Sequence, residues 1–477
     1  MLIAVAIAVG LALRAWEAAH WSLWLDELHT LAHASQPTVS AVAANVGKEL
    51  HSPLFFVFVH LFGAWEQGAW LRAIPVLSSL LVFAPLLAFA RTSKSSSASI
   101  VLVAWLFACL PYDVHYSTEL RPYAWLMLFS AGAAWAAFRE QGSRVASFVL
   151  FAVCVALGMW THKLMAVTVF SIGVARLFVR KPAMLHLGWL VLAGAIAVAP
   201  SLPWMLSFAG QATEKRFDYQ ESVGGYHLRR VLVMEFLALP SRLFVPYLGA
   251  LGGAWAWIAK FGAFVLFGCI ASAIVGGFFN RRAIATDSSS SVRALAIFVA
   301  VDFVLVTALS IYTWDRLPLQ YYAPIAWALP LLVVQLAPAF GAANRAKFST
   351  SLAASALALG IAQAGGRCSM DMRAAVAAAR EAGSQLEKPQ FSALLSQPSL
   401  FEQVLPYRAY GRDLEFVEPE EVAGSDGRSP VRPLVVIRRA TFPLTDDVWK
   451  PLLAGRKSTR EIRVDAYLTV FVFEPAN

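Results

Sequence analysis

The segment MLIAVAIAVGLALRAWEAAHWSLWLDELHT, residues 1–30, joins a long apolar run to a pair of adjacent acids, Asp26 and Glu27. The run over residues 2–20 is long enough to cross the roughly 30 Å hydrocarbon core of a bilayer as one helix. It has no basic segment ahead of it and no convincing small-residue cleavage site after it, so we expect a retained span, not a signal peptide. The acid pair then follows this span at the membrane surface.

The composition of the whole chain points to the same environment. Of 477 residues, 58% are hydrophobic and 14% are charged, against about a quarter charged in soluble proteins. Apolar runs of about twenty residues recur, which predicts a polytopic all-α membrane protein. The net charge of +9 is explained by basic cytoplasmic loops, so no nucleic-acid partner is expected. The four cysteines are scattered and form neither a zinc motif nor a disulfide framework.

The apolar runs and the loops between them predict the topology. We expect about eleven spans, at residues 2–20, 70–90, 98–115, 123–138, 145–160, 164–179, 185–205, 253–277, 294–313, 322–340 and 348–365. Every second connection is short and basic: RTSK (91–94), REQGSR (139–144), RLFVRKP (176–182), NRRAIATDSSSSVR (280–293) and NRAK (344–347). Such loops stay in the cytoplasm, which places the N-terminus inside and WLDELHT outside. HSPLFFVFVHLFGAW in the first outer connection is too short to span and favours an interfacial helix.

The composition changes near residue 366. Residues 366–477 contain 30 charged residues in 112, against 39 in the preceding 365. A helix is expected at 372–383 and strands within 433–439 and 460–474. We therefore expect a membrane domain over 1–365 and a small α+β soluble domain over 366–477, which an odd number of spans places outside.

Polar side chains gather at the outer ends of the predicted spans. They are Asp26, Glu27, Tyr112, Asp113, His115, Tyr116, Glu119, Arg121, His162, Lys163, Tyr312, Asp315, Arg316, Tyr321 and Tyr322. Each alone is consistent with a solvated loop residue. Together they favour a cleft in which a carboxylate takes a proton from a hydroxyl and cations neutralise a phosphate leaving group.

Six segments in order carry a resemblance to a known superfamily. They are WLDELHT (24–30), HSPLFF (51–56), LRAIPVLSS (71–79), YSTELRPY (116–123), THK (161–163) and QYYAP (320–324). The chain resembles the GT-C membrane glycosyltransferases, in particular the superfamily of the protein O-mannosyltransferases and the lipid-A aminoarabinose transferases. The resemblance covers residues 1–330. Two positions depart from the pattern, because Lys163 replaces a tyrosine and Gln320 replaces an arginine.

The resemblance implies roles for individual residues. Asp26 is the expected catalytic base and Glu27 its supporting neighbour, while the other expected site residues, His51, Glu119, Arg121, His162, Lys163 and Tyr321, bind the donor phosphate and sugar. Arg121 either binds phosphate or holds Glu119 in a salt bridge. Arg316 or Lys163 would replace the cation missing at Gln320.

The implied activity is an inverting hexosyl or pentosyl transfer from a polyprenyl-phosphate donor to an outward-facing glycolipid, polysaccharide or protein at the bacterial inner membrane. No cofactor is expected: the acids could hold a divalent ion, but no dedicated metal ligand spacing is visible. The alternatives are a secondary transporter or lipid flippase, and a non-catalytic scaffold. Transporters place polar groups at the bilayer midplane, where only Asp302 lies here, and we expect a packing role for it. Arg14 and Lys260 are expected to snorkel.

Overall fold

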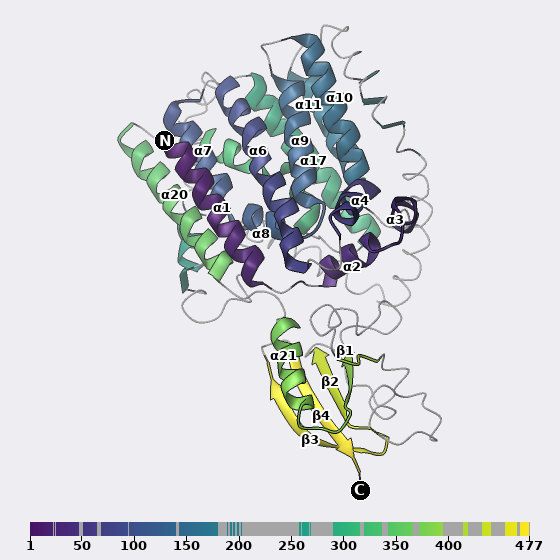
Figure 1. Ribbon diagram of the computed structural model, residues 1–477. Helices are drawn as coiled ribbons and strands as arrows, with labels where there is room; N and C mark the ends of the chain where they lie inside the picture. Colours follow the sequence, from purple (N-terminus) through teal and green to yellow (C-terminus); the bar gives the residue numbers. More distant parts are fainter. Residues whose placement is uncertain are drawn as a thin grey trace. The chain divides into compact units, whose positions relative to one another are not determined.

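The computed structural model divides the chain into two compact units (Figure 1). The helical unit comprises Met1–Ala19, His33–Ala64 and Trp70–Arg367, and the sheet unit comprises His20–Ala32, Trp65–Ala69 and Cys368–Asn477. The structure describes residues 1–21, 23, 25–46, 51–63, 68–93, 95–139, 143–179, 290–314, 319–335, 342–365, 372–394, 414–417, 432–439, 454–464 and 468–476, with scattered helical residues between 188 and 268. Most of the spans expected at 185–205 and 253–277 lie outside these residues.

The regular elements in the described part of the membrane region are all helices. Its elements are α1 (Leu2–His20), α2 (Leu25–Ala34), α3 (Val39–Val46), α4 (Pro53–Leu61), η1 (Gly68–Arg72), α6 (Ala73–Thr92), α7 (Ser97–Cys109), α8 (Pro111–Thr118), α9 (Tyr123–Phe138), α10 (Arg144–Thr161), α11 (Met165–Val179), α17 (Ser290–Trp314), η4 (Leu319–Tyr322), α18 (Ala323–Ala326), α19 (Leu329–Gln335) and α20 (Ala342–Gly365). Four of the described helical stretches are long and apolar enough to cross a membrane, or five if the bent pair α7–α8 is one span. A multi-pass membrane protein is confirmed, and the number of eleven spans stays a prediction.

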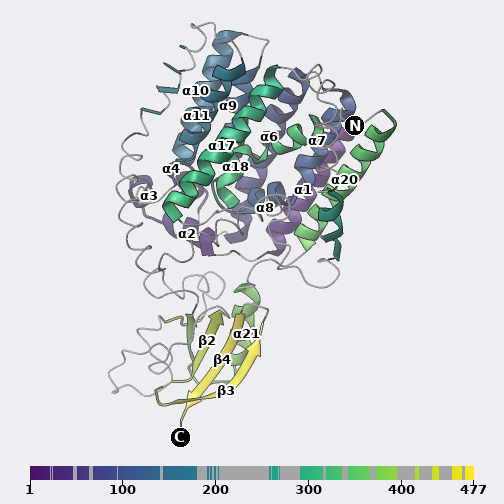
Figure 2. The same cartoon turned by 180° about the vertical axis from the view of Figure 1, so that it is seen from behind.

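Helix α9 is the centre of the helical unit. It packs against α6, α10, α11, α17 and α18, of which the first four are labelled near it in both views (Figures 1 and 2). Its sequence YAWLMLFSAGAAWAAF is apolar on every side and rich in small residues. A Cβ atom at Gly132 would lie 2.6 Å from Sγ of Cys154 in α10. Small residues allow this close approach, which is how helices associate where no water drives them together.

The third predicted span is broken, which corrects the single span expected over 98–115. Helices α7 and α8 meet at Leu110 and Pro111 with a bend of 52°. Proline has no N–H to continue the helical ladder, and its ring clashes with the preceding turn. The break leaves carbonyl oxygens of α7 without helical partners. It also places α8, with its polar side chains, inside the helical unit, and all eight residues of this helix are buried.

Arg14 occupies the break, and the expectation that it snorkels is wrong. Its side chain is fully buried, and its guanidinium donates to the carbonyl oxygens of Ala108 at 2.8 Å and Phe107 at 3.2 Å. A cation at the negative C-terminal end of a helix satisfies these orphan acceptors. Glycines also allow the neighbouring helices α1 and α20 to approach the end of α7 closely. A Cβ at Gly10 of α1 would lie 2.9 Å from Cβ of Ala108, and one at Gly360 of α20 would collide with the carbonyl oxygen of Cys109.

After the last expected span, the described residues of the sheet unit form four strands and one helix. The elements are α21 (Met372–Gly383), β1 (Gln390–Leu394), β2 (Leu434–Arg439), β3 (Arg456–Arg463) and β4 (Leu468–Pro475). The strand order is β1-β2-β4-β3, with β1 and β2 parallel and the other pairs antiparallel. Helix α21 packs on β2 and β4 through the alanine and valine face that its sequence predicts. The expected helix and strands are confirmed, with 460–474 divided between β3 and β4.

Candidate active site

Two histidines from distant segments meet at one end of the helices α4 and α10. His51 precedes the Ser52-Pro53 start of α4, and His162 follows the last residue of α10. Their backbones form an isolated antiparallel bridge, and the N–H of Ser52 donates to the carbonyl oxygen of Thr161 at 3.3 Å. The two imidazole rings lie 4.9 Å apart. Backbone pairing therefore fixes the relative position of two side chains that the motifs HSPLFF and THK predict for the site.

Arg121 joins this pair from the connection between α8 and α9. Its Nη2 donates to Nε2 of His51 at 2.8 Å, and its guanidinium lies over the ring of Tyr123 at 6.0 Å from the centroid. The N–H of Arg121 donates to the carbonyl oxygen of Glu119 at 2.7 Å, so the connection turns tightly between these two residues. His51, Arg121 and His162 form what we term the imidazole–guanidinium cluster.

The hydrogen bonds of this cluster determine where its protons are. Nε2 of His51 accepts from Arg121, so the proton of that ring is on Nδ1. Nδ1 of His162 accepts from the N–H of Leu164 at 3.1 Å, so its proton is on Nε2. Within the described residues, neither of these two buried N–H donors has a hydrogen-bond partner. A buried donor without a partner is costly, so these two donors indicate a place for a ligand that accepts hydrogen bonds.

Burial and neighbouring cations keep both histidines neutral. Desolvation, and then the charge of Arg121, hold the pKa of His51 well below its usual range. Desolvation, followed by the charges of Arg121 and Lys163, lowers the pKa of His162 to about 3. At neutral pH the cluster therefore offers one guanidinium and two neutral N–H donors. This combination suits an anion such as a phosphate.

Lys163 and Tyr321, two further residues of the motifs, lie beside the cluster. Lys163 is buried in the turn between α10 and α11, close enough for its charge to act on both histidines. The ring of Tyr321 lies 6.2 Å from that of His162. The side chain of Gln320 and all of Arg316 lie outside the described residues.

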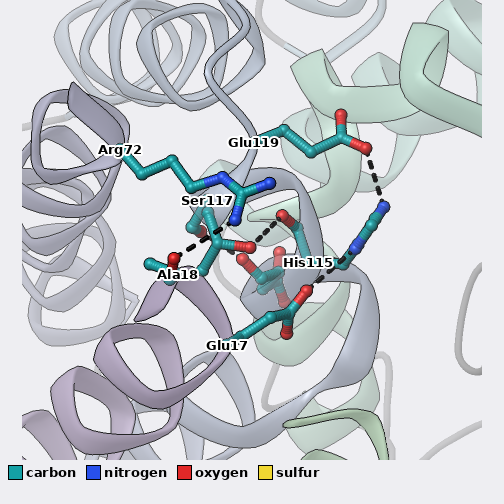
Figure 3. Close-up of polar contacts among 8 residues, drawn as sticks. Glu17, Ala18, Arg72, His115, Ser117 and Glu119 are labelled. Atoms are coloured by element: carbon teal, nitrogen blue, oxygen red, sulfur yellow. Dashed lines mark hydrogen bonds and ion pairs between the residues drawn. The ribbon is translucent and has the colours of Figure 1, made fainter. Parts of the chain in front are cut away.

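Glu119 has a partner that the sequence did not suggest. One of its carboxylate oxygens lies 2.8 Å from Nε2 of His115, and Nδ1 of His115 hydrogen-bonds to Glu17 of α1 at 2.9 Å. Figure 3 shows His115 between the two carboxylates, with Arg72 directed toward the carbonyl oxygen of Ala18. Glu119 therefore pairs with His115, and the choice between phosphate and Glu119 as the partner of Arg121 stays a prediction. The sequence contains a feature that could have indicated Glu17. Arg14 and Glu17 are two charged residues, three positions apart, within an apolar run, and charged residues inside a membrane span are usually paired or functional.

Asp26 and Glu27 lie in the first turn of α2 and belong to the sheet unit. Glu27 is buried and Asp26 is partly exposed, and the carbonyl oxygen of Asp26 accepts a hydrogen bond from the Thr30 hydroxyl at 3.2 Å. Their convergence with His51 and Glu119 stays a prediction. Among the described residues, no group of three or more His, Cys, Asp or Glu side chains could hold a metal ion.

Comparisons with known proteins agree with this architecture. No family model and no curated protein matches the chain. ArnT from Cupriavidus metallidurans in the apo state has a TM-score of 0.56 at 12% sequence identity, covering 99% of this chain and 97% of that one. The same protein bound to undecaprenyl phosphate gives the same values. The archaeal oligosaccharyltransferase AglB from Archaeoglobus fulgidus has a TM-score of 0.48 at 13% identity, covering 91% of this chain and 69% of that one. The alignment with ArnT includes the C-terminal residues that no motif covers, and the chain therefore has the GT-C fold that its motifs predict.

Proposed function

We propose that this protein is a membrane glycosyltransferase that moves a sugar from a polyprenyl-phosphate donor to an outward-facing acceptor. The observation that carries the proposal is the imidazole–guanidinium cluster, with its guanidinium and two buried N–H donors. A phosphate that accepts from these donors would remove the cost of leaving them unpaired. ArnT, which shares the fold, binds undecaprenyl phosphate in a solved structure, and this supports a lipid phosphate as the ligand.

The proposed chemistry is one displacement with inversion at the anomeric carbon. Asp26 acts as the general base that takes the proton of the acceptor hydroxyl, and Glu27 supports it. As the bond to the sugar breaks, negative charge develops on the leaving phosphate. In this proposal Arg121, Lys163 and the N–H groups of the two histidines receive that charge, and preorganised donors of this kind lower the barrier because they need no rearrangement.

The remaining predicted residues take positions around this reaction. Glu119 pairs with His115 and begins the turn that carries Arg121, and we assign it to holding this turn. Tyr321 offers an aromatic surface beside His162 for the sugar of the donor. Lys163 supplies the cation that is missing at Gln320. The lipid tail would lie among the apolar helices, which keeps the phosphate at the membrane surface.

The proposed location is the inner membrane of a bacterium, with the site and residues 366–477 on the extracytoplasmic side. The five alternating basic loops support this orientation. Reporter fusions after residue 366 should be active only outside the cytoplasm. Fusions that report from the cytoplasm would contradict the orientation and leave the chemistry of the cluster to be tested by itself.

The decisive experiment follows the donor. Membranes containing the protein are incubated with polyprenyl-phosphate sugars labelled in the sugar, and release of label from the lipid is measured. We expect consumption of one donor by the wild type, and a rate lower by about 10²–10³ in Arg121→Gln, because a preorganised charge is lost at the leaving group. Arg139→Gln is the matched control, since Arg139 follows α9 and hydrogen-bonds Ser147 and the Ser143 carbonyl. A wild type that consumes none of the donors would contradict the proposal.

A further inference from the structure

Glu17 is a carboxylate buried in the first span. Its side chain is 1% exposed, and it lies outside all six motif segments. A charge in the interior of a membrane protein is expensive and persists where it is paired or has a function. Its hydrogen-bond partner at 2.9 Å is Nδ1 of His115, which lies 98 residues later in the chain.

His115 is held by carboxylates at both ring nitrogens. Nδ1 faces Glu17 at 2.9 Å, and Nε2 faces Glu119 at 2.8 Å. A neutral imidazole has one N–H and one lone pair, so one of its nitrogens would direct a lone pair at a carboxylate. An imidazolium has a donor at each nitrogen and fits both contacts. The arrangement is thus a charged bridge, Glu17–His115–Glu119, with side chains no more than 7% exposed (Figure 3).

The bridge is connected to the imidazole–guanidinium cluster through three residues of chain. The N–H of Glu119 donates to the carbonyl oxygen of His115 at 3.2 Å, and the N–H of Arg121 donates to the carbonyl oxygen of Glu119 at 2.7 Å. Arg121 then reaches His51 at 2.8 Å. The side chain and backbone of Glu119 are therefore both anchored to His115, and the direction of Arg121 depends on where Glu119 is held.

We propose that Glu17 is a positioning residue for the active site: together with Glu119 it keeps His115 as an imidazolium, and this buried bridge fixes the turn that presents Arg121 to the lipid phosphate. This inference rests on the proposed function for its ligand. It assigns a role to the first transmembrane helix, which supplies no residue to the predicted cluster.

The test uses Glu17→Gln in the full chain. Glutamine keeps the shape and an acceptor oxygen, but it removes the charge that favours the imidazolium. The first readout is the nitrogen spectrum of 15N-histidine-labelled protein in liposomes at pH 8, where a solvated histidine is neutral. His115→Gln identifies the His115 signals. We expect imidazolium signals for His115 in the wild type and their loss in Glu17→Gln.

The second readout is binding of undecaprenyl phosphate to the same proteins. We expect the Kd to rise about ten- to a hundredfold in Glu17→Gln, because one charge-assisted hydrogen bond no longer holds the turn. Ser117→Ala is the control with unchanged Kd, since in the described part of the chain the Ser117 hydroxyl donates to the carbonyl oxygen of Asp113 within α8. Glu17→Asp keeps the charge, so it should retain the imidazolium and serves in place of Glu17→Gln if that variant does not fold.

Each outcome decides the inference. A neutral His115 in the wild type overturns the charged bridge. An imidazolium that is lost in Glu17→Gln without any change in Kd overturns the positioning role. A wild type that binds no polyprenyl phosphate overturns the proposed function and the positioning role with it, whereas the nitrogen spectrum still decides whether the bridge is charged. For Glu17→Asp, an imidazolium with a near wild-type Kd supports the inference, and an imidazolium with the Kd raised tenfold or more overturns it.

Discussion

The two units of the molecule hold ion pairs in opposite environments. In the helical unit, His115 and its two carboxylate partners are at most 7% exposed. In the sheet unit, Arg432 binds Glu415 through two hydrogen bonds of 3.1 and 2.8 Å, yet these side chains are 32% and 58% exposed. The geometry of the surface pair is at least as good. Geometry alone therefore does not decide how much an ion pair contributes to stability.

Solvent explains the difference. Water competes for both partners of the surface pair, so hydration nearly compensates for the ion pair when one partner is removed. A buried pair has no such replacement, and removal of one partner leaves an uncompensated charge in a medium of low dielectric constant. Buried polar groups therefore determine where chain segments lie, whereas the surface pair adds little to stability. The predictions below test this contrast, from the largest expected effect to the smallest.

The largest effect is expected where a charge takes part in the reaction instead of holding structure. Asp26→Asn keeps the shape of the side chain but cannot accept a proton, so turnover should fall by about 10²–10⁴ with the thermal unfolding midpoint unchanged. Release of label from the donor in a single turnover measures the effect. Near wild-type turnover would remove Asp26 from the mechanism and would revive the scaffold alternative.

A glycine at the helix break tests whether the interior is as rigid as the contrast requires. Gly360→Ala would push a methyl group against the backbone carbonyl of Cys109, and overpacking of this kind costs about 1–3 kcal/mol. Gly173→Ala in α11 is the control, because no atom lies within 4 Å of the added Cβ. In detergent, the thermal unfolding midpoint should be lower for Gly360→Ala and unchanged for Gly173→Ala. Equal midpoints would mean that α20 moves aside freely.

Acid sensitivity should come from the buried histidines. The pKa of His162 is about 3 in the folded protein and about 6.5 when unfolded, so between these values only the unfolded chain binds the proton. Stability then falls as the pH decreases below 6.5, by at most about 1.4 kcal/mol per pH unit for this residue. His162→Gln should make the unfolding midpoint less dependent on pH between 6.5 and 5. Identical slopes for the wild type and His162→Gln would contradict the assignment.

The smallest effect is expected at the surface pair. Glu415→Gln should reduce stability by about 0.2–1 kcal/mol, and less at high ionic strength because salt screens exposed charges. Its contribution is present at neutral pH and is lost on acidification, since Arg432 holds the pKa of Glu415 below its usual range. Chemical unfolding of the full chain at low and high salt measures it. A loss of stability as large as that caused by Gly360→Ala would contradict the expectation that exposed ion pairs contribute less than the buried interior.

The sequence predicted the parts of the fold that depend on hydrophobic length and on short motifs. The apolar runs predicted α1, α6, α9, α10 and α17, because a span needs a fixed length of apolar residues. The motifs predicted His51, Arg121 and His162, which the structure brings together. The break at Pro111 was missed, because an apolar run reads as continuous whether or not its helix bends. Arg14 was misjudged and Glu17 was not singled out for a related reason: their partners in α7 and α8 lie more than ninety residues away, and no local pattern reports such a distance.

The buried charges of α1 have a consequence for how the protein is made. When α1 emerges during synthesis, the partners of Arg14 and Glu17 at residues 107–115 do not yet exist. An unpaired arginine at the centre of a membrane helix raises the free energy of insertion by about 2.5–3.5 kcal/mol. The first helix is thus held in the bilayer only weakly until α7 and α8 arrive, and its stable insertion waits for theirs. During biogenesis α1 is therefore stabilised only after α7 and α8 have been inserted beside it. In a chain that stops before α8, the N-terminal helix should be accessible to quality-control proteases.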